Sequence, residues 1–200
     1  MGTITATTAD LALALGTVMH AASKDAARPV LHSVMLEPGR LGVRAVAADN
    51  YRIAVRDFAG TADGPMILDL DDAATLHKLL RAERVTSDVT ITEGNPDRGT
   101  ATWAYGARTI GLRLIDGTFP NYLQVIPPDT RKGDLVIGIA GAYIAEAAKA
   151  LAPSKPGLYG QRAGANLRVT LNTDPRAPVI VRPQDPDSTA FEVIMPVALR

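Results

Sequence analysis

The 200-residue sequence has no cysteine, few aromatic residues, no long apolar run and no excess of charge of either sign. The absence of cysteine excludes disulfides, thiolate metal sites and a thiol nucleophile, and it is compatible with the cytosol. Because aromatic residues make up only 4% of the chain, the core has to be built from Val, Ile, Leu and Ala. Basic and acidic residues balance at 21 each, which argues against a protein that coats nucleic acid by bulk attraction. Any contact with nucleic acid has to come from a local basic surface or from topology.

The N-terminal residues show none of the features that predict a signal peptide. Residues 1–10 have neither a basic start nor an apolar run, so we expect no signal peptide there. Nowhere do about 18 consecutive apolar residues occur, as a membrane-spanning helix requires. The sequence therefore predicts a cytoplasmic protein.

A pattern of one strand, one amphipathic helix and several short strands occurs three times along the chain. In the first copy Thr8 is the predicted cap of the helix. The apolar residues of this helix recur every three or four positions, at Leu11, Leu15, Val18 and Ala22. The predicted strands of the first copy are 3–7, 30–37, 41–47 and 51–58.

The second and third copies repeat this order. The second opens with a strand at 66–70, and Asp71 or Asp72 is the predicted cap of its helix. Its later strands are predicted at 89–93, 101–105 and 109–114. The third copy opens at 135–139, its helix ends before Pro153, and its strands are predicted at 167–171, 179–182 and 191–195. The segment 127–133 is rich in proline and polar residues and predicts a linker.

Short strands with helices on one face predict an α+β fold built from βαβββ half-repeats. A single half-repeat of about 60 residues hardly buries its apolar face, so half-repeats are expected to pair. The predicted organisation is a complete domain at 1–126, with half-repeats at about 1–60 and 64–126, a linker at 127–133, and a single half-repeat at 134–200. The alternative is an ordinary α+β domain without a true repeat.

Three parts of the sequence resemble the β sliding clamp family, the beta subunit of bacterial DNA polymerase III. They are RPVL at 28–31 with AADNYRIAV at 47–55, LIDGTFPNY at 114–122, and FEVIMPVAL at 191–199. Residues 3–126 resemble the middle domain of the family, and 133–199 resemble the second half of its last domain. The resemblance implies a DNA-clamp fold, with antiparallel sheets outside and helices on the inner face. It does not cover the family's first domain or the first half of its last domain.

The resemblance also implies a function. It predicts a non-enzymatic ring subunit that encircles double-stranded DNA without sequence specificity, acts at the nucleoid, and tethers DNA polymerase and clamp-loader peptides. Because family rings contain twelve half-repeats and this chain carries three, we expect a homo-oligomer, with a tetramer favoured over a dimer. The alternative is a clamp-derived interaction or inhibitor protein that does not encircle DNA.

Two sets of site residues follow from the resemblance. The residues expected to face DNA are Lys24, Arg28, Lys78, Arg81, Arg84, Lys149 and Lys155. The residues expected to form a groove for partner peptides are Leu31, Arg52, Ile53, Pro120, Val125, Val193, Met195, Pro196, Val197 and Leu199. For the basic set the alternative is an ordinary charged helix surface, since nearby acidic residues almost balance it. For the apolar set the alternative is burial in the core, above all for Ile53 and Val193.

No catalytic constellation is expected, and neither is a cofactor. The three histidines have no metal-binding spacing, and the glycine-rich stretch 157–164 lacks the Lys-Ser/Thr ending of a phosphate-binding loop. Asp69, Asp71 and Asp72 could be taken for a metal site, but acidic residues at the start of a helix explain them more simply.

Overall fold

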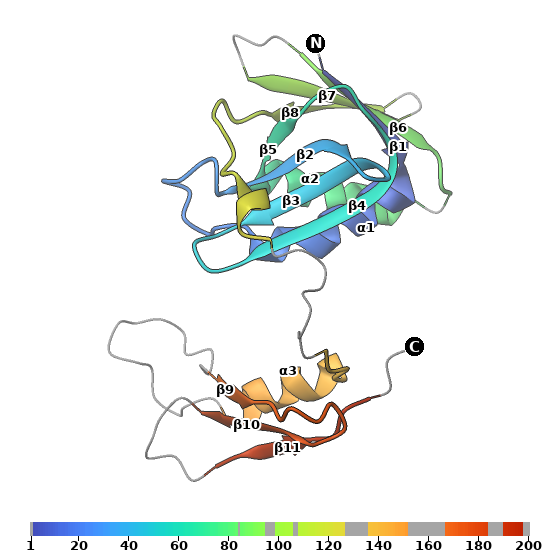
Figure 1. The fold of residues 1–200 in the computed structure, drawn as a ribbon. Coiled ribbons are helices and arrows are strands. Elements are labelled where there is room, and N and C mark those ends of the chain that lie inside the picture. The colour runs from blue at the N-terminus through green and yellow to red at the C-terminus, as the bar shows by residue number, and fades with distance from the viewer. Residues whose placement is uncertain are drawn as a thin grey trace. The chain divides into compact units, whose positions relative to one another are not determined.

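The computed structural model describes residues 2–83, 85–94, 99–105, 108–126, 136–151, 167–183 and 190–197. The chain forms two compact units, Met1–Ile126 and Pro127–Arg200, which are described separately below (Figure 1). The predicted linker at 127–133 lies outside the described residues. No helix in the described ranges is long and apolar enough to cross a membrane.

The first unit contains two successive groups of one strand, one helix and three strands. The elements of the first group are β1 (Thr3–Thr7), α1 (Thr8–Val18), η1 (Met19–Ala21), β2 (Ser33–Gly39), β3 (Gly42–Ala48) and β4 (Ile53–Ala62). Those of the second group are β5 (Met66–Asp69), α2 (Leu70–Ala82), β6 (Asp88–Glu93), β7 (Thr100–Tyr105) and β8 (Arg108–Arg113), followed by the short helix η3 (Tyr122–Gln124).

The two groups of the first unit exchange their opening strands. All eight strands form one antiparallel sheet in the order β5-β2-β3-β4-β1-β6-β7-β8, so β1 pairs with β6 of the second group and β5 pairs with β2 of the first. The two ends of the sheet also meet, because Leu68 bridges Leu114 and the N–H of Ile115 donates to the carbonyl of Ile67 at 2.8 Å. The sheet curls over the helices α1 and α2 (Figure 1).

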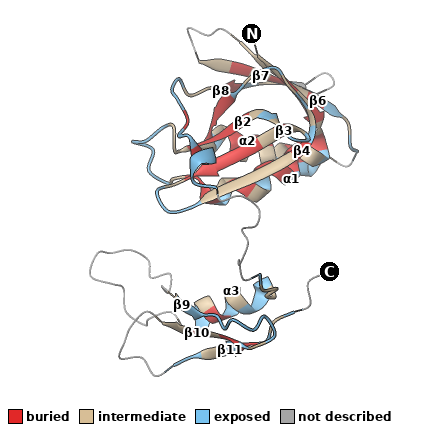
Figure 2. Cartoon of the chain, in the orientation of Figure 1, coloured by how far each residue is buried: buried red, intermediate tan, exposed pale blue. Residues whose placement is uncertain are grey.

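Helix α1 packs its apolar side into the core of the first unit, as its spacing predicts. Leu11, Leu15 and Val18 are fully buried. The cap is Thr7 rather than the predicted Thr8, because the Thr7 hydroxyl accepts the N–H of Asp10 at 3.1 Å. The buried side chains of α1 and α2 share one core with inward-facing residues of the sheet, such as Val34 and Leu36 of β2. Figure 2 marks the buried parts of these elements in red.

Helix α2 begins at the acidic run that could be taken for a metal site. The Asp69 carboxylate caps the helix, accepting the N–H groups of Asp71 at 3.0 Å and Asp72 at 3.4 Å. Arg113 then binds both Asp69, at 2.8 Å, and Asp72, at 3.2 Å. The interpretation as a helix start is confirmed, but the predicted caps Asp71 and Asp72 are wrong by two and three positions.

The second unit contains α3 (Gly141–Ala150), β9 (Leu167–Thr170), β10 (Val179–Pro183) and β11 (Glu192–Ile194). Its strands form an antiparallel sheet in the order β11-β10-β9. The N–H of Val197 donates to the carbonyl of Gly138 at 2.9 Å, so the segment before α3 meets the end of the chain's last strand. In the first unit β1 meets β4, and β5 meets β8, in the same way. The predicted α+β fold, with repeated strand–helix–strand groups and antiparallel sheets, is confirmed.

Candidate functional site

A second apolar cluster lies on the face of the first sheet that is turned away from α1 and α2. Side chains alternate along each strand, so Val34 and Leu36 of β2 enter the main core while Met35 between them enters this second cluster. We call it the outer cluster; its buried members are Met35, Val46, Ala48, Ile67, Phe119 and Tyr122. The rings of Phe119 and Tyr122 meet edge to face, with centroids 6.4 Å apart and planes at 79°. These two residues fix the segment after β8 against the sheet.

A chain of polar contacts ties Tyr122 to three strands. Its hydroxyl donates to the Glu37 carboxylate on β2, and Nη1 of Arg44 on β3 donates to the same hydroxyl at 3.4 Å. Arg44 also binds Asp57 on β4 in a bidentate pair, with Nε and Nη2 at 2.8 Å and 3.0 Å from the two oxygens. Glu37 lies opposite Arg44 in the sheet, and Arg44 lies opposite Asp57. The hairpin registers therefore align these charges on one face.

The pKa shifts in this network favour a protonated Tyr122 and an ionised Asp57, the two states that its hydrogen bonds require. The hydrogen bond from Arg44 is the main reason why the pKa of Asp57 lies below its ordinary value. Burial raises the pKa of Tyr122, and its hydrogen bond to Glu37 raises it further. Around neutral pH the phenol therefore stays protonated as a donor, and the Arg44–Asp57 pair stays charged. Sequence patterns did not predict this network, although alternating charges on β2, β3 and β4 are a signal for it once the register is known.

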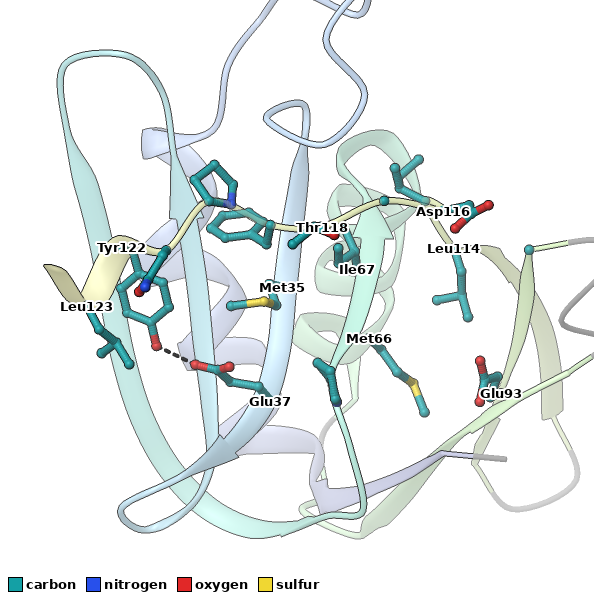
Figure 3. A pocket seen from close by; sticks show the side chains of 17 residues that line it. Met35, Glu37, Met66, Ile67, Glu93, Leu114, Asp116, Thr118, Tyr122 and Leu123 are labelled. Atoms are coloured by element: carbon teal, nitrogen blue, oxygen red, sulfur yellow. Dashed lines mark hydrogen bonds between the residues drawn. The ribbon is translucent and has the colours of Figure 1, made fainter. Parts of the chain in front are cut away.

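A pocket of about 670 Å³ opens beside the outer cluster, between β2, β5 and the segment 114–123. Figure 3 shows Met35, Met66 and Ile67 along it, with the carboxylates of Glu37 and Glu93. The sequence did not predict this pocket, because its walls come from five separate parts of the chain.

Three of the predicted groove residues of the first unit lie at the outer cluster or on the segment that covers it. Ile53 is half-buried and packs against the cluster, in line with a partial role in the core. Leu31 is half-buried, whereas Pro120 and Val125 are exposed on the segment that covers the cluster. The structure thus brings Ile53 and the Pro120 segment together, although 67 positions separate them in sequence.

Arg52, the remaining groove residue of this unit, is exposed and binds Asp49 at 3.0 Å. Burial raises the pKa of Asp49, but hydrogen bonds from the N–H groups of Tyr51 and Arg52 and from the Arg52 guanidinium outweigh it, so the pKa lies below its ordinary value. The neighbouring Tyr51 side chain is 89% exposed. The turn between β3 and β4 therefore presents one cation and one aromatic ring to solvent.

The predicted groove residues of the second unit form an apolar stripe at the end of the chain. Val193, Met195 and Val197 are 50%, 61% and 46% exposed, while Ile194 between the first two is buried against β10. Pro196 is half-buried, and Leu199 lies outside the described residues. Val193, for which burial in the core was the alternative, is thus half exposed.

The predicted DNA-facing residues that the structure describes are all exposed: Lys24, Arg28, Lys78, Arg81 and Lys149. Arg84 and Lys155 lie outside the described residues.

Helix α2 carries the clearest basic pair of this set. Lys78 and Arg81 are three positions apart and therefore lie on one side of α2. Burial lowers the pKa of His77, and the nearby charge of Arg81 lowers it further. Arg28 is less available than the α2 pair, because it lies 3.5 Å from Asp25.

Comparison with known proteins places the chain in a family. The model of the DNA polymerase III beta subunit, central domain, matches residues 5–121. The chain is similar to the beta sliding clamp of Caulobacter vibrioides, with 30% identity over 100 residues that cover 48% of this chain and 26% of the relative.

Solved structures share the fold over almost the whole chain. A DnaN sliding clamp from Bartonella birtlesii bound to griselimycin matches with a TM-score of 0.75 and 21% identity, covering 98% of this chain and 52% of that one. The DNA polymerase III subunit beta from Pseudomonas aeruginosa matches with a TM-score of 0.74 and 23% identity, covering 96% and 51%. The chain spans about half the length of these structures and about a quarter of the curated relative. The resemblance in the sequence is confirmed: the protein belongs to the DNA polymerase III beta subunit, or sliding clamp, family.

Proposed function

We propose that the protein is a sliding-clamp-like processivity factor, whose copies form a ring around duplex DNA at the nucleoid and tether DNA polymerase and clamp-loader peptides. One observation carries the proposal: the clamp-type first unit has an exposed basic pair on its helix layer and exposed apolar residues over the opposite face of its sheet. A ring subunit needs both surfaces at once, one for the DNA inside and one for partners outside.

The DNA contact would be loose and independent of sequence. Lys78 and Arg81 present their charges from a rigid helix, and Lys149 does so on α3. Contacts of this kind go to phosphates and weaken steeply with salt, because each one releases condensed counterions. With a net charge of zero, retention on DNA would depend on enclosure rather than on affinity, which leaves the ring free to slide.

One of the contacts between copies in the ring would lie in the second unit. In the first unit, β2 and β6 each pair on one side with the opening strand of the other group. Strand β9 holds the corresponding place in the second unit, yet among the described residues it pairs with β10 alone, and its Val169 is half exposed. An edge strand of this kind favours pairing with another chain. We propose that two second units pair about a two-fold axis and that four copies supply twelve half-repeats.

Partner peptides would bind to the apolar side chains that both units expose. Each fully buried apolar anchor stabilises a complex by roughly 1.5–3 kcal/mol before the costs of ordering the peptide. Val193, Met195 and Val197 offer a stripe with alternate spacing, which suits an extended peptide. A few such anchors give modest affinity, so that partners can exchange on one ring.

Retention on closed circular DNA tests the enclosure. Protein is diluted until its oligomer dissociates, concentrated again with circular or linear DNA, and separated by gel filtration at raised salt. We expect retention on circles alone and release when a restriction enzyme cuts the circle. The double variant Lys78→Gln, Arg81→Gln should be loaded on fewer circles, because these charges hold the DNA while the ring closes, whereas the matched control Arg40→Gln, Arg176→Gln, which removes two exposed charges in turns, should be loaded as the wild type is.

Equal retention on circular and linear DNA would contradict enclosure. It would favour the alternative, a clamp-derived interaction protein that does not encircle DNA.

A further inference from the structure

The pocket beside the outer cluster has a lining that differs almost wholly from the predicted peptide groove. Its walls are β2, β5, the end of β6, Gly99 and the segment 114–123, and of the predicted groove residues that the structure describes only Pro120 lines it. Its volume of about 670 Å³ falls in the range of roughly 300–1,000 Å³ that is typical of binding pockets. It lies wholly within the first unit and does not depend on ring formation.

The floor of the pocket is apolar and adaptable. Met35 on β2 and Met66 on β5 line it together with Ile67 and Leu114 (Figure 3). Methionine side chains are flexible and polarisable, so they fit apolar groups of different shapes. This floor can therefore cover the methylene groups of a long side chain.

The charged side chains that are known to line the pocket are all acidic. Three carboxylates line the pocket, those of Glu37, Glu93 and Asp116, and none of the lining residues that the structure describes is Lys, Arg or His. Glu37 accepts the Tyr122 hydroxyl, and Glu93 accepts the N–H of Gly2 at 2.8 Å.

These hydrogen bonds orient the two glutamates without neutralising them, because both donors are uncharged. The nearest cation of the polar network, Arg44, is already matched by Asp57. The pocket therefore attracts cations and disfavours anions.

We propose that this pocket binds a peptide segment of a partner protein that inserts a Lys or Arg side chain next to an apolar residue. The stem of such a side chain would lie along the methionines while its cationic head reaches the carboxylates. The neighbouring apolar residue would occupy the remainder of the floor, near Leu114.

Methionine-methyl NMR tests this directly, because the chain has only five methionines and two of them line the pocket. The probe is acetyl-Leu-Arg-Leu-amide, added to the full chain labelled with ¹³C at the methionine methyl groups. We expect the signals of Met35 and Met66 to move, while Met19 on η1 and Met195 of the predicted groove stay in place. The matched peptide acetyl-Leu-Glu-Leu-amide should leave all signals unmoved.

A variant that lacks two of the pocket's carboxylates provides the second experiment. The double variant Glu93→Gln, Asp116→Asn keeps the side-chain sizes and an acceptor for Gly2, so its fold should persist. It should bind the arginine peptide about fivefold more weakly, as the loss of two partly exposed ion pairs of about 0.5 kcal/mol each predicts. The control Glu146→Gln, Asp174→Asn removes two exposed carboxylates of the second unit and should bind as the wild type does.

Three results would overturn the proposal: unmoved Met35 and Met66 signals at millimolar arginine peptide, equal shifts with the glutamate peptide, or unchanged binding by the pocket variant. Movement of Met195 alone would assign the peptide to the predicted groove and would likewise overturn it. Since none of these readouts requires DNA or a ring, failure here is distinguishable from failure of the proposed function.

Discussion

Replacement of Tyr122 by Phe isolates the polar network that holds the covering segment to the sheet. The change deletes one hydroxyl and leaves the edge-to-face contact with Phe119 intact. It removes the donor to Glu37 and the acceptor of the longer bond from Arg44. The loss in the free energy of unfolding therefore comes from the missing hydrogen bonds, because the change creates no cavity.

The expected destabilisation is about 1.5 kcal/mol. A hydrogen bond to a charged group contributes roughly 1.5–3 kcal/mol, and the lower end applies because Glu37 is only half-buried and water can replace part of the lost contact. For a unit of this size such a loss lowers Tm by about 5 °C. Tyr51→Phe is the matched control, since its side chain is 89% exposed and its loss should cost close to nothing.

Urea unfolding followed by tryptophan fluorescence measures the change. The single tryptophan, Trp103, is 1% exposed in the first unit, so it reports the unfolding of this unit. A pH series adds a signed prediction. Because the pKa of Tyr122 is raised in the folded state, its contribution is complete below pH 10 and is lost as pH rises above that value. The variant should lack this part of the alkaline decline.

A cost below about 0.5 kcal/mol, or an alkaline decline identical in wild type and variant, would refute this reasoning. Either result would mean that the Glu37–Tyr122 contact does not stabilise the folded unit.

Three further changes have defined outcomes. Gly42→Ala should destabilise the first unit by about 3 kcal/mol in urea unfolding, because φ is +114° and a Cβ would overlap the carbonyl of Gly60; Gly64→Ala, with open space around it, should cost almost nothing. Asp69→Ala should cost about 1–2 kcal/mol in the same assay, since it removes the cap of α2, and a value near zero would contradict the capping role. Arg81→Gln should raise the pKa of His77 in an NMR titration, because one of the two causes of its depression is lost; an unchanged pKa would show that burial alone is responsible.

The sequence predicted the helices well because their apolar spacing reflects burial directly. Leu11, Leu15 and Val18 recur at helical intervals and enter the core. The caps were less predictable, since Thr7 and Thr8 are both competent and only the backbone geometry at the end of β1 selects the first.

Several predicted strands began too early, and the largest such error, three residues, is at the strand predicted for 30–37. Residues 30–32 are apolar or neutral enough to look extended, but they belong to a turn in which the N–H groups of Leu31 and His32 donate to the carbonyl of Arg28. Strand β2 therefore starts at Ser33 rather than at Val30.

In the candidate sites, too, features that depend on neighbouring residues were predictable and features that depend on the fold were not. The groove residues were predicted from short sequence motifs, each made of residues that are close together in the sequence. The network of Glu37, Arg44 and Tyr122 depends instead on hairpin register and on a contact between positions 85 residues apart. No local pattern encodes such a contact, so it emerged only with the fold.

The mass of the protein in solution, measured by light scattering at several concentrations, tests the proposed ring most directly. Two-fold pairing of second units alone gives a dimer, so the proposed ring of four copies also needs a contact between first units. It predicts a species near four times 21.1 kDa that dissociates through a dimer on dilution. A monomer that persists at every concentration would contradict the ring and leave the exposed edge of β9 without its proposed partner.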